Sequence, residues 1–324
     1  MRFPRDAYWM VFLATSAVTW ISVPLWRRWC VRNGLVDEPG GRKDHGSVIP
    51  LAGGLAVLTG LAFVVLMGWL AIQFDVLEGT GRQLLAHGMG RRVVPLGAVL
   101  LGALGMLLLG VLDDSRELPA GIKFGGQLLI ALLVATAGVR ATLFVPSLVF
   151  SYAVTVLWIL TITNAVNFLD NMNGLCAGLG LIAAAWFATT AIRHGQYLVA
   201  LLALSIAGAL AGFLPHNFPR ARVFLGDGGS HLTGFLLAVL ALLPNFYSMA
   251  HPVRWAVLEP LVVLLVPLMD LSQVVCTRIR AGKPVWIGDH NHLSHRLVRL
   301  GLNRTQAVAV LWLVAVGAGI ITLW

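Results

Sequence analysis

Long apolar stretches separated by short polar segments follow one another along the whole chain. Stretches of about 17 to 25 apolar residues are long enough to cross a hydrocarbon core about 30 Å thick as α-helices. The pattern predicts ten transmembrane helices, near residues 7–26, 51–72, 93–112, 121–138, 146–165, 174–192, 197–214, 231–249, 255–276 and 306–324. The weak alternation of a membrane β-barrel is absent. We therefore predict an all-α integral membrane protein, a bundle of about ten transmembrane helices that forms a single polytopic domain over residues 1–324.

The composition supports this fold class, and the distribution of basic residues predicts how the protein is oriented in the membrane. Of the 324 residues, 58% are apolar and only 11% are charged, compared with about 25% charged residues in soluble domains. Ten spans place both termini on one side, and the connections on the other side carry 15 of the 23 Lys and Arg residues. That side is predicted to be cytoplasmic. Much of the net charge of +9 is explained by basic residues in the loops that face anionic lipid headgroups. Nucleic acid is therefore not expected as a partner.

Polar residues collect at four places beside the predicted spans. They are Asp113 with Asp114, the segment NAVNFLDNMNGL at 164–175, FLGDGGS at 224–230, and DHNHLSHR at 289–296. All four lie on the predicted cytoplasmic side. A transporter would be expected to place some of this polarity near the middle of the membrane, so the pattern favours chemistry at the membrane surface.

The motif GVLDD ends the third predicted span with Asp113 and Asp114. Two acids solvated at a helix end are an equally acceptable explanation. The helix dipole opposes negative charge at this end, so we expect a positive partner: Lys123, Arg116, a divalent cation, or a proton shared with a phosphate. An acid held there could act as a general base.

The Asn-rich segment repeats polar residues at helical spacing. Asn164, Asn167, Asp170 or Asn171, and Gly174 follow one another at steps of three or four residues, so they can share one face. A polar helix–helix contact or a helix cap is the simpler alternative. Amide and carboxylate oxygens together suit Mg²⁺, a sugar, or both.

The motif FLGDGGS opens the eighth predicted span. Its glycines and Ser230 would leave free N–H groups at the positive end of a helix dipole, which suits a phosphate. Asp227 could hold a Mg²⁺ that bridges to the phosphate, and Phe224 could stack on a base. A flexible glycine turn with Asp227 as an N-cap remains the alternative.

A histidine cluster precedes the last predicted span. His290, His292 and His295 could bind zinc or a phosphate group. Lys283 and Arg296 favour the anion, because cations near Zn²⁺ would oppose its binding. In the first cytoplasmic loop, three basic residues precede the second span. They are Arg42, Lys43 and His45, for which solvated positive-inside charge is the simpler explanation.

Taken together, these features predict phosphoryl transfer to or from a lipid. Five motifs also resemble, in order, those of the polyprenyl-phosphate N-acetylhexosamine-1-phosphate transferases (glycosyltransferase family 4). They are GLVDEPGGRKDHGSVIPLAGG, GVLDD, NAVNFLDNMNGL, FLGDGGS and DHNHLSHRL. The family includes initiating enzymes of O-antigen and teichoic-acid synthesis and the peptidoglycan phospho-MurNAc-pentapeptide translocase.

The resemblance implies a reaction. A polyprenyl phosphate such as undecaprenyl phosphate attacks a UDP-N-acetylhexosamine, and the products are polyprenyl-diphospho-sugar and UMP. The resemblance also implies Mg²⁺, with Mn²⁺ as an alternative, an inner (plasma) membrane location with a cytoplasmic active site, and a role in initiating cell-envelope glycan synthesis. A homodimer is a reasonable expectation.

The resemblance also implies residue roles. The catalytic set is Asp113, Asp114, Lys123, Asp170, His290, His292 and His295. The metal-binding set is Asp227 and Asn167, and the substrate-binding set is Arg42, Lys43, His45, Asn164, Asn167, Asn173, Phe224, Ser230 and Arg296.

The chain also departs from the family pattern. Asp170-Asn171 and Asn173-Gly174 stand where many members have two Asp-Gly pairs. The motifs look closer to the GlcNAc branch, so UDP-GlcNAc is the first choice of donor. A lipid or nucleotide-sugar transporter and a non-catalytic scaffold are the alternatives. Near Pro260 and Pro267, the ninth span is expected to be a bent helix with a buried structural acid.

Overall fold

The computed structural model describes residues 4–38, 48–74, 90, 92–141, 143–244, 254–286 and 291–323. Within these residues, seven helices are long and apolar enough to cross a membrane. They are α1 (Arg5–Arg32), α2 (Gly53–Gln73), α4 (Val93–Arg116), α6 (Leu148–Phe168), α7 (Leu175–Arg193), α8 (Tyr197–Asn217) and α13 (Arg304–Ile321). Two further helices are shorter: the apolar helix α5 (Ala120–Thr136) and α9 (Gly226–Leu240). The prediction of an all-α integral membrane protein is confirmed.

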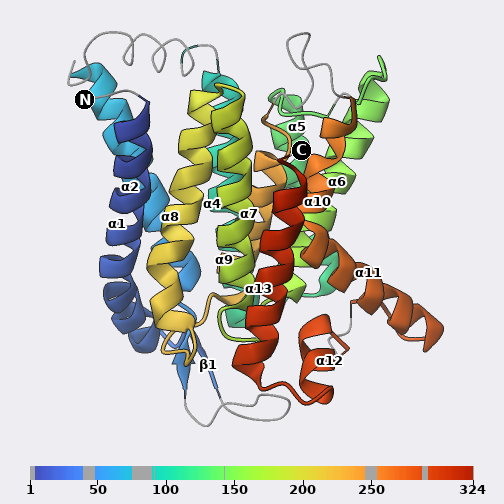
Figure 1. Cartoon of the computed structure of the whole chain (residues 1–324). Coiled ribbons are helices and arrows are strands. Elements are labelled where there is room, and N and C mark those ends of the chain that lie inside the picture. The colour runs from blue at the N-terminus through green and yellow to red at the C-terminus, as the bar shows by residue number, and fades with distance from the viewer. Residues whose placement is uncertain are drawn as a thin grey trace.

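The predicted span near 255–276 is broken. A short 3₁₀ helix, η1 (Arg254–Leu258), leads into α10 (Glu259–Val263), and α11 (Leu265–Arg280) follows after a bend of 71°. Pro267 explains the break, because it has no N–H to donate to the carbonyl of Val263 and its ring crowds that turn. The bent helix agrees with the prediction, and α11 leaves the bundle toward the lower right of Figure 1.

The central helix α9 differs most from its predicted range of 231–249. It begins at Gly226, so the acidic motif lies in its first turn, and it ends at Leu240. Pro244 follows closely and disfavours a longer helix. Every residue of α9 except Asp227 is buried, because α2, α4, α6, α7 and α8 pack around it. A helix enclosed by protein does not have to match the thickness of a bilayer.

A short ribbon and a short helix lie at the lower end of the bundle (Figure 1). Strand β1 (Val36–Asp37) pairs antiparallel with β2 (Ile49–Pro50), and α12 (Leu293–Arg299) precedes α13. Phe224 N–H donates to the carbonyl of Pro50 (2.9 Å), and Gly53 N–H donates to the carbonyl of Phe224 (3.0 Å). These bonds tie the ribbon to the segment that enters α9. Both chain ends lie toward the upper end.

Two glycines allow the backbone of α9 to pack closely against α2 and α4. A Cβ added at Gly110 of α4 would lie 2.3 Å from the carbonyl oxygen of Asp227. A Cβ added at Gly54 of α2 would lie 2.5 Å from the backbone nitrogen of Gly229. Small residues at such positions let membrane helices approach closely. Here they fix the first turn of α9.

Candidate active site

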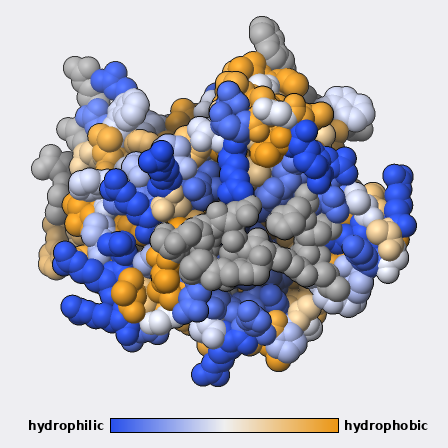
Figure 2. All heavy atoms as spheres, turned by 90° about the horizontal axis from the view of Figure 1, so that it is seen from below, coloured by the Kyte–Doolittle hydropathy of each residue, from blue (hydrophilic) through white to orange (hydrophobic). Residues whose placement is uncertain are grey.

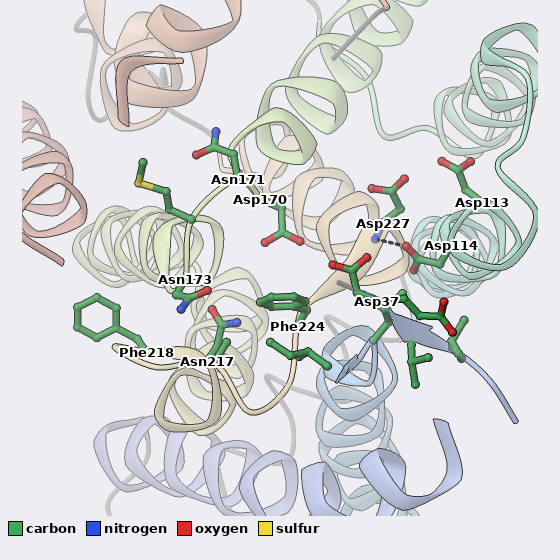
Figure 3. Close-up of a pocket in the computed structure, with 18 of the residues that line it drawn as sticks. Asp37, Asp113, Asp114, Asp170, Asn171, Asn173, Asn217, Phe218, Phe224 and Asp227 are labelled. Atoms are coloured by element: carbon green, nitrogen blue, oxygen red, sulfur yellow. Dashed lines mark hydrogen bonds between the residues drawn. The ribbon is translucent and has the colours of Figure 1, made fainter. Parts of the chain in front are cut away.

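A cavity of about 1330 Å³ opens at the lower end of the bundle. Hydrophilic side chains gather over this face, as Figure 2 shows. Five aspartates line the cavity, from the ribbon, the end of α4, the turn after α6 and the start of α9. They are Asp37, Asp113, Asp114, Asp170 and Asp227 (Figure 3). The four sequence motifs therefore meet at one end of the molecule, as their predicted placement requires.

Asp113 lies in the last turn of α4 and is buried. The chain reverses direction after Arg116, so α5 runs back beside α4 and brings Lys123 to it. Lys123 Nζ lies 2.5 Å from Asp113 Oδ2, and the N–H of Leu118 donates to Asp113 Oδ1 (2.8 Å). Of the two basic residues considered from the sequence, Lys123 provides the positive partner.

Asp114, the next residue, points to a different partner. Its Oδ1 accepts from the N–H of Asp227 (2.9 Å), and its Oδ2 accepts from the N–H of Gly228 (3.1 Å). Figure 3 shows this contact with the first turn of α9. The sequence suggested that these N–H groups bind a phosphate. In the structure the Asp114 carboxylate occupies two of them and is favourably placed against the helix dipole.

Asn167 orients Asp227. Its side-chain amide donates to Asp227 Oδ1 and to Ser230 Oγ, both at 2.8 Å. Ser230 is completely buried and donates to the carbonyl of Asp227 (3.3 Å). The carboxyl groups of Asp113 and Asp227 lie within hydrogen-bonding range of each other. Two carboxyl groups this close require a proton or a cation between them.

These donors fit Mg²⁺. Among the described residues, no group of three or more His, Cys, Asp or Glu side chains is arranged to enclose a metal ion. Mg²⁺ usually keeps several waters and is bound by one or two carboxylates together with substrate phosphates. Asp227 and the neighbouring Asp113 provide such a pair. A closed site made by protein alone is not needed.

Asp170 lies in the turn between α6 and α7 and faces the same space. Burial, together with the negative charges of Asp114 and Asp37, raises its pKa to about 7, although the hydrogen bond from the N–H of Gly226 opposes this rise. Asp37, from strand β1, was not among the predicted site residues. It lies in the GLVDEP motif, but only the pairing of β1 with β2 brings it to the cavity.

Aromatic and amide side chains line another part of the cavity. Figure 3 shows Phe224 between Asp170 and Asn217. Asn217 is buried; it accepts from the N–H of Gly174 (2.6 Å) and donates to the carbonyl of Val223 (2.9 Å). The first bond joins the end of α8 to the start of α7, and the second ties the end of α8 to the segment that enters α9. Asn217, like Phe218 and Arg220 nearby, lines the cavity but was missed from the sequence, where it reads only as the end of a span.

Asn173 is held less tightly at the same wall. Its side-chain amide donates to the carbonyl of Pro219 (3.3 Å), and the half-buried side chain lines the cavity.

The histidines occupy different positions. His295 lines the cavity. His292 is buried, and its Nδ1 lies 2.7 Å from Asp270 Oδ2. Asp270 Oδ1 also accepts from the N–H of Leu293 (2.7 Å), so this buried acid of α11 holds the start of α12. Ser294 Oγ donates to Asn171 Oδ1 (2.7 Å), which ties α12 to the Asn-rich turn.

Four other predicted site residues lie outside the described part of the chain. They are Arg42, Lys43, His45 and His290. Arg296 is exposed on α12 and donates to Thr277 Oγ1 (3.5 Å). Asn164 lies inside the bundle, where it contacts Gln127. Neither Arg296 nor Asn164 is among the described residues that line the cavity.

The fold and this site define a polytopic membrane protein with a carboxylate-rich cavity at one end of its helix bundle. The model of glycosyl transferase family 4 matches residues 96–245. A protein of Bacillus subtilis (strain 168), named probable undecaprenyl-phosphate N-acetylglucosaminyl 1-phosphate transferase, is 32% identical over 94% of this chain and 81% of the relative. The chain belongs to glycosyl transferase family 4, which confirms the predicted resemblance.

Two further relatives carry related names. A decaprenyl-phosphate N-acetylglucosaminephosphotransferase of Mycobacterium tuberculosis (strain ATCC 25618 / H37Rv) is 35% identical over 94% of this chain and 79% of the relative. An undecaprenyl-phosphate alpha-N-acetylglucosaminyl 1-phosphate transferase of Escherichia coli (strain K12) is 26% identical over 94% of this chain and 79% of the relative.

Proposed function

We propose that this protein transfers N-acetylglucosamine 1-phosphate from UDP-GlcNAc to a polyprenyl phosphate and releases UMP. The names of the three relatives support the transferred group and the lipid acceptor. The observation that carries the proposal is the contact among Lys123, Asp113 and Asp227 inside a cavity at one end of a membrane bundle. A transporter has no support from the relatives.

Mg²⁺ is proposed as the cofactor, with Mn²⁺ as an alternative. Asp227 would hold the ion with Asp113 beside it, and Asn167 would keep the Asp227 carboxylate in position. When bound, the ion would neutralise charge on the diphosphate and on the leaving UMP.

The protein's own groups provide positioning and proton transfer. Lys123 presents positive charge where the lipid phosphate must approach, and Asp113 takes the residual proton of that phosphate on its carboxylate. An oxygen of the lipid phosphate then forms a bond to the sugar-bearing phosphorus. The bond from that phosphorus to the UMP oxygen breaks, and UMP leaves with its electron pair. Phe224 would stack on the uracil ring.

The proposed location is the inner (plasma) membrane, with the cavity facing the cytoplasm. The end that carries the cavity is the end where the sequence concentrates Lys and Arg, and such residues favour the cytoplasmic side. A homodimer and a role in initiating cell-envelope glycan synthesis are proposed from the family resemblance.

The test uses purified protein, undecaprenyl phosphate and a panel of UDP-sugars, with Mg²⁺ or with EDTA. We expect UMP release that requires lipid and a divalent cation, is greatest with UDP-GlcNAc, and is lost in Asp227→Asn. UDP release would indicate simple glycosyl transfer instead. Binding of a UDP-sugar by folded protein without nucleotide release across the panel would refute the proposal and favour a transporter.

A further inference from the structure

A second group of polar side chains lies one helical turn deeper in the bundle than the carboxylate site. The same three helices build both layers. Gln127 follows Lys123 by four residues on α5, and His231 follows Asp227 by four residues on α9. Residues four apart lie on the same helix face, about 6 Å apart along the axis.

Helix α6 contributes to both layers in the opposite direction. It runs toward the cavity, so Asn164 lies one turn deeper than Asn167. In the outer layer Asn167 bonds to Asp227. In the inner layer Asn164 Nδ2 donates to Gln127 Oε1 (2.7 Å). Each side chain of the inner layer therefore lies one helical turn further from the cavity than an outer-layer side chain on the same helix.

Two of the three inner-layer side chains are buried, Asn164 is half-buried, and the hydrogen bonds among them have a defined donor–acceptor direction. Gln127 and His231 are 1% and 2% exposed. Asn164 Nδ2 also donates to the carbonyl of Leu160 (2.8 Å), and a carbonyl can only accept. This contact fixes the Asn164 amide with its nitrogen toward Gln127. The oxygen of Gln127 must then accept from Asn164, which leaves its nitrogen to donate.

The donor–acceptor direction of these hydrogen bonds determines which ring nitrogen of His231 carries the proton. Gln127 Nε2 lies 3.3 Å from His231 Nε2, and because Gln127 donates, Nε2 of His231 is the acceptor. A neutral ring that accepts at Nε2 carries its proton on Nδ1. Within the described residues, His231 Nδ1 has no hydrogen-bond partner. The bond from Gln127 is therefore the contact that orients this ring.

We propose that Asn164, Gln127 and His231 form a positioning layer that sets α5 against α6 and α9 and so holds Lys123 on Asp113. The inference rests on the proposed function. It gives Asn164 a role inside the bundle in place of substrate contact. Buried polar networks specify one arrangement of packed helices. Residues that support the side chains of a site from outside it hold those side chains in a defined orientation.

A pair of amide variants tests the proposal. The terminal amide of Gln reaches the position of the imidazole Nε2, whereas that of Asn ends near Nδ1. His231→Gln can therefore accept from Gln127, and His231→Asn cannot. We expect His231→Gln to keep kcat within about threefold of the parent, and His231→Asn and Gln127→Leu to lower kcat by about 10- to 100-fold. The KM for UDP-GlcNAc should change little, because none of these residues lines the cavity.

Thr155→Val is the matched control. Thr155 is another buried polar residue of α6, at the end far from the cavity; it accepts from the N–H of Ala141 (3.0 Å) and donates to the carbonyl of Ser151 (2.7 Å). Its loss should lower stability without lowering kcat. Equal kcat for His231→Gln and His231→Asn, or an equal loss in Thr155→Val, would overturn the proposal.

A second measurement is independent of turnover. In ¹⁵N-histidine-labelled protein, with the signal assigned by its loss in His231→Gln, the spectrum of His231 should be that of a neutral ring protonated at Nδ1. Gln127→Leu should change this tautomer. A charged ring, or a proton on Nε2, would contradict the inferred layer. If the parent protein shows the expected tautomer but releases no UMP, the proposed function fails and the inferred layer does not.

Discussion

Replacing each of the two adjacent aspartates of α4 by Asn should have different effects: Asp114→Asn should mainly lower stability, and Asp113→Asn should mainly lower activity. Asp114 uses both carboxylate oxygens, one on the N–H of Asp227 and one on the N–H of Gly228. Asn has the same shape but only one acceptor oxygen, so its NH₂ group would face the second N–H. Losing one charge-assisted bond and leaving a donor unpaired costs about 1.5–3 kcal/mol. Asp114→Asn should therefore lower the free energy of unfolding by about 2 kcal/mol.

Asp113→Asn should leave the fold nearly intact. Its Oδ1 accepts from the N–H of Leu118, which an Asn oxygen can still do, and its Oδ2 faces Lys123. The side chain of Lys123 is 33% exposed, so water can compensate for part of the lost ion pair, and the cost in stability should be about 1 kcal/mol or less. Because this variant removes the proposed proton acceptor, the kcat should fall by at least about 100-fold.

Both variants are compared by SDS-titrated unfolding in mixed micelles and by UMP release under saturating substrates. Asp6→Asn is the control, because Asp6 lies in the first turn of α1, which begins at the end of the bundle away from the cavity (Figure 1), and its carboxylate is partly exposed; its kcat should not change, and its stability should change little. Parent-like stability of Asp114→Asn would refute the assignment of Asp114 to the first turn of α9. Equal destabilisation by Asp113→Asn would show that the two carboxylates share one structural role.

Three further predictions follow from the same geometry. Gly110→Ala should lower stability by about 1–3 kcal/mol and reduce UMP release, because α9 must move away from the new methyl group. The control is Gly97→Ala on the same helix, where the added methyl group meets open space. This variant should be neutral or stabilising in thermal unfolding. For Asp170, the pKa of about 7 in the folded protein exceeds the usual value of about 4. The folded state therefore binds more protons between these values, and the Tm should fall as pH rises from 5 to 8 without substrate; Asp170→Asn should make this slope smaller. Lys123→Met should lower kcat by about 10- to 100-fold, whereas Lys123→Arg, which keeps the charge, should retain more activity in the same UMP assay.

Apolar length predicted most of the fold but not the extent of every helix. Hydropathy reports that residues 231–249 avoid water; it does not distinguish contact with lipid from contact with protein. Because other helices surround α9, its fifteen residues are sufficient. The break before α11 was predictable from Pro267, since proline has a local effect on the backbone. The size of the bend was not, because packing determines it.

The site was predictable as a set of motifs at one end, and its internal contacts were not. Counting spans placed Asp113, Asp114 and Asp227 on the same side of the membrane. The bond from Asp114 to the first turn of α9 joins residues more than a hundred positions apart, and no local pattern specifies such a partner. Asp37 was missed for a related reason, because its position depends on a ribbon of two-residue strands too short to detect by alternation.

The charge of the cavity argues for the proposed cation. Among the described lining residues, seven are Asp or Glu and three are Lys or Arg. Both proposed substrates carry phosphate, so an acidic cavity would repel them unless positive charge enters with them or protons reduce the negative charge. Asp170, with its pKa of about 7, can remain partly protonated at neutral pH, but the contact between Asp113 and Asp227 concentrates negative charge at one point. A divalent cation that enters with the diphosphate would offset both charges at that point, which explains why two acids are placed together next to Lys123.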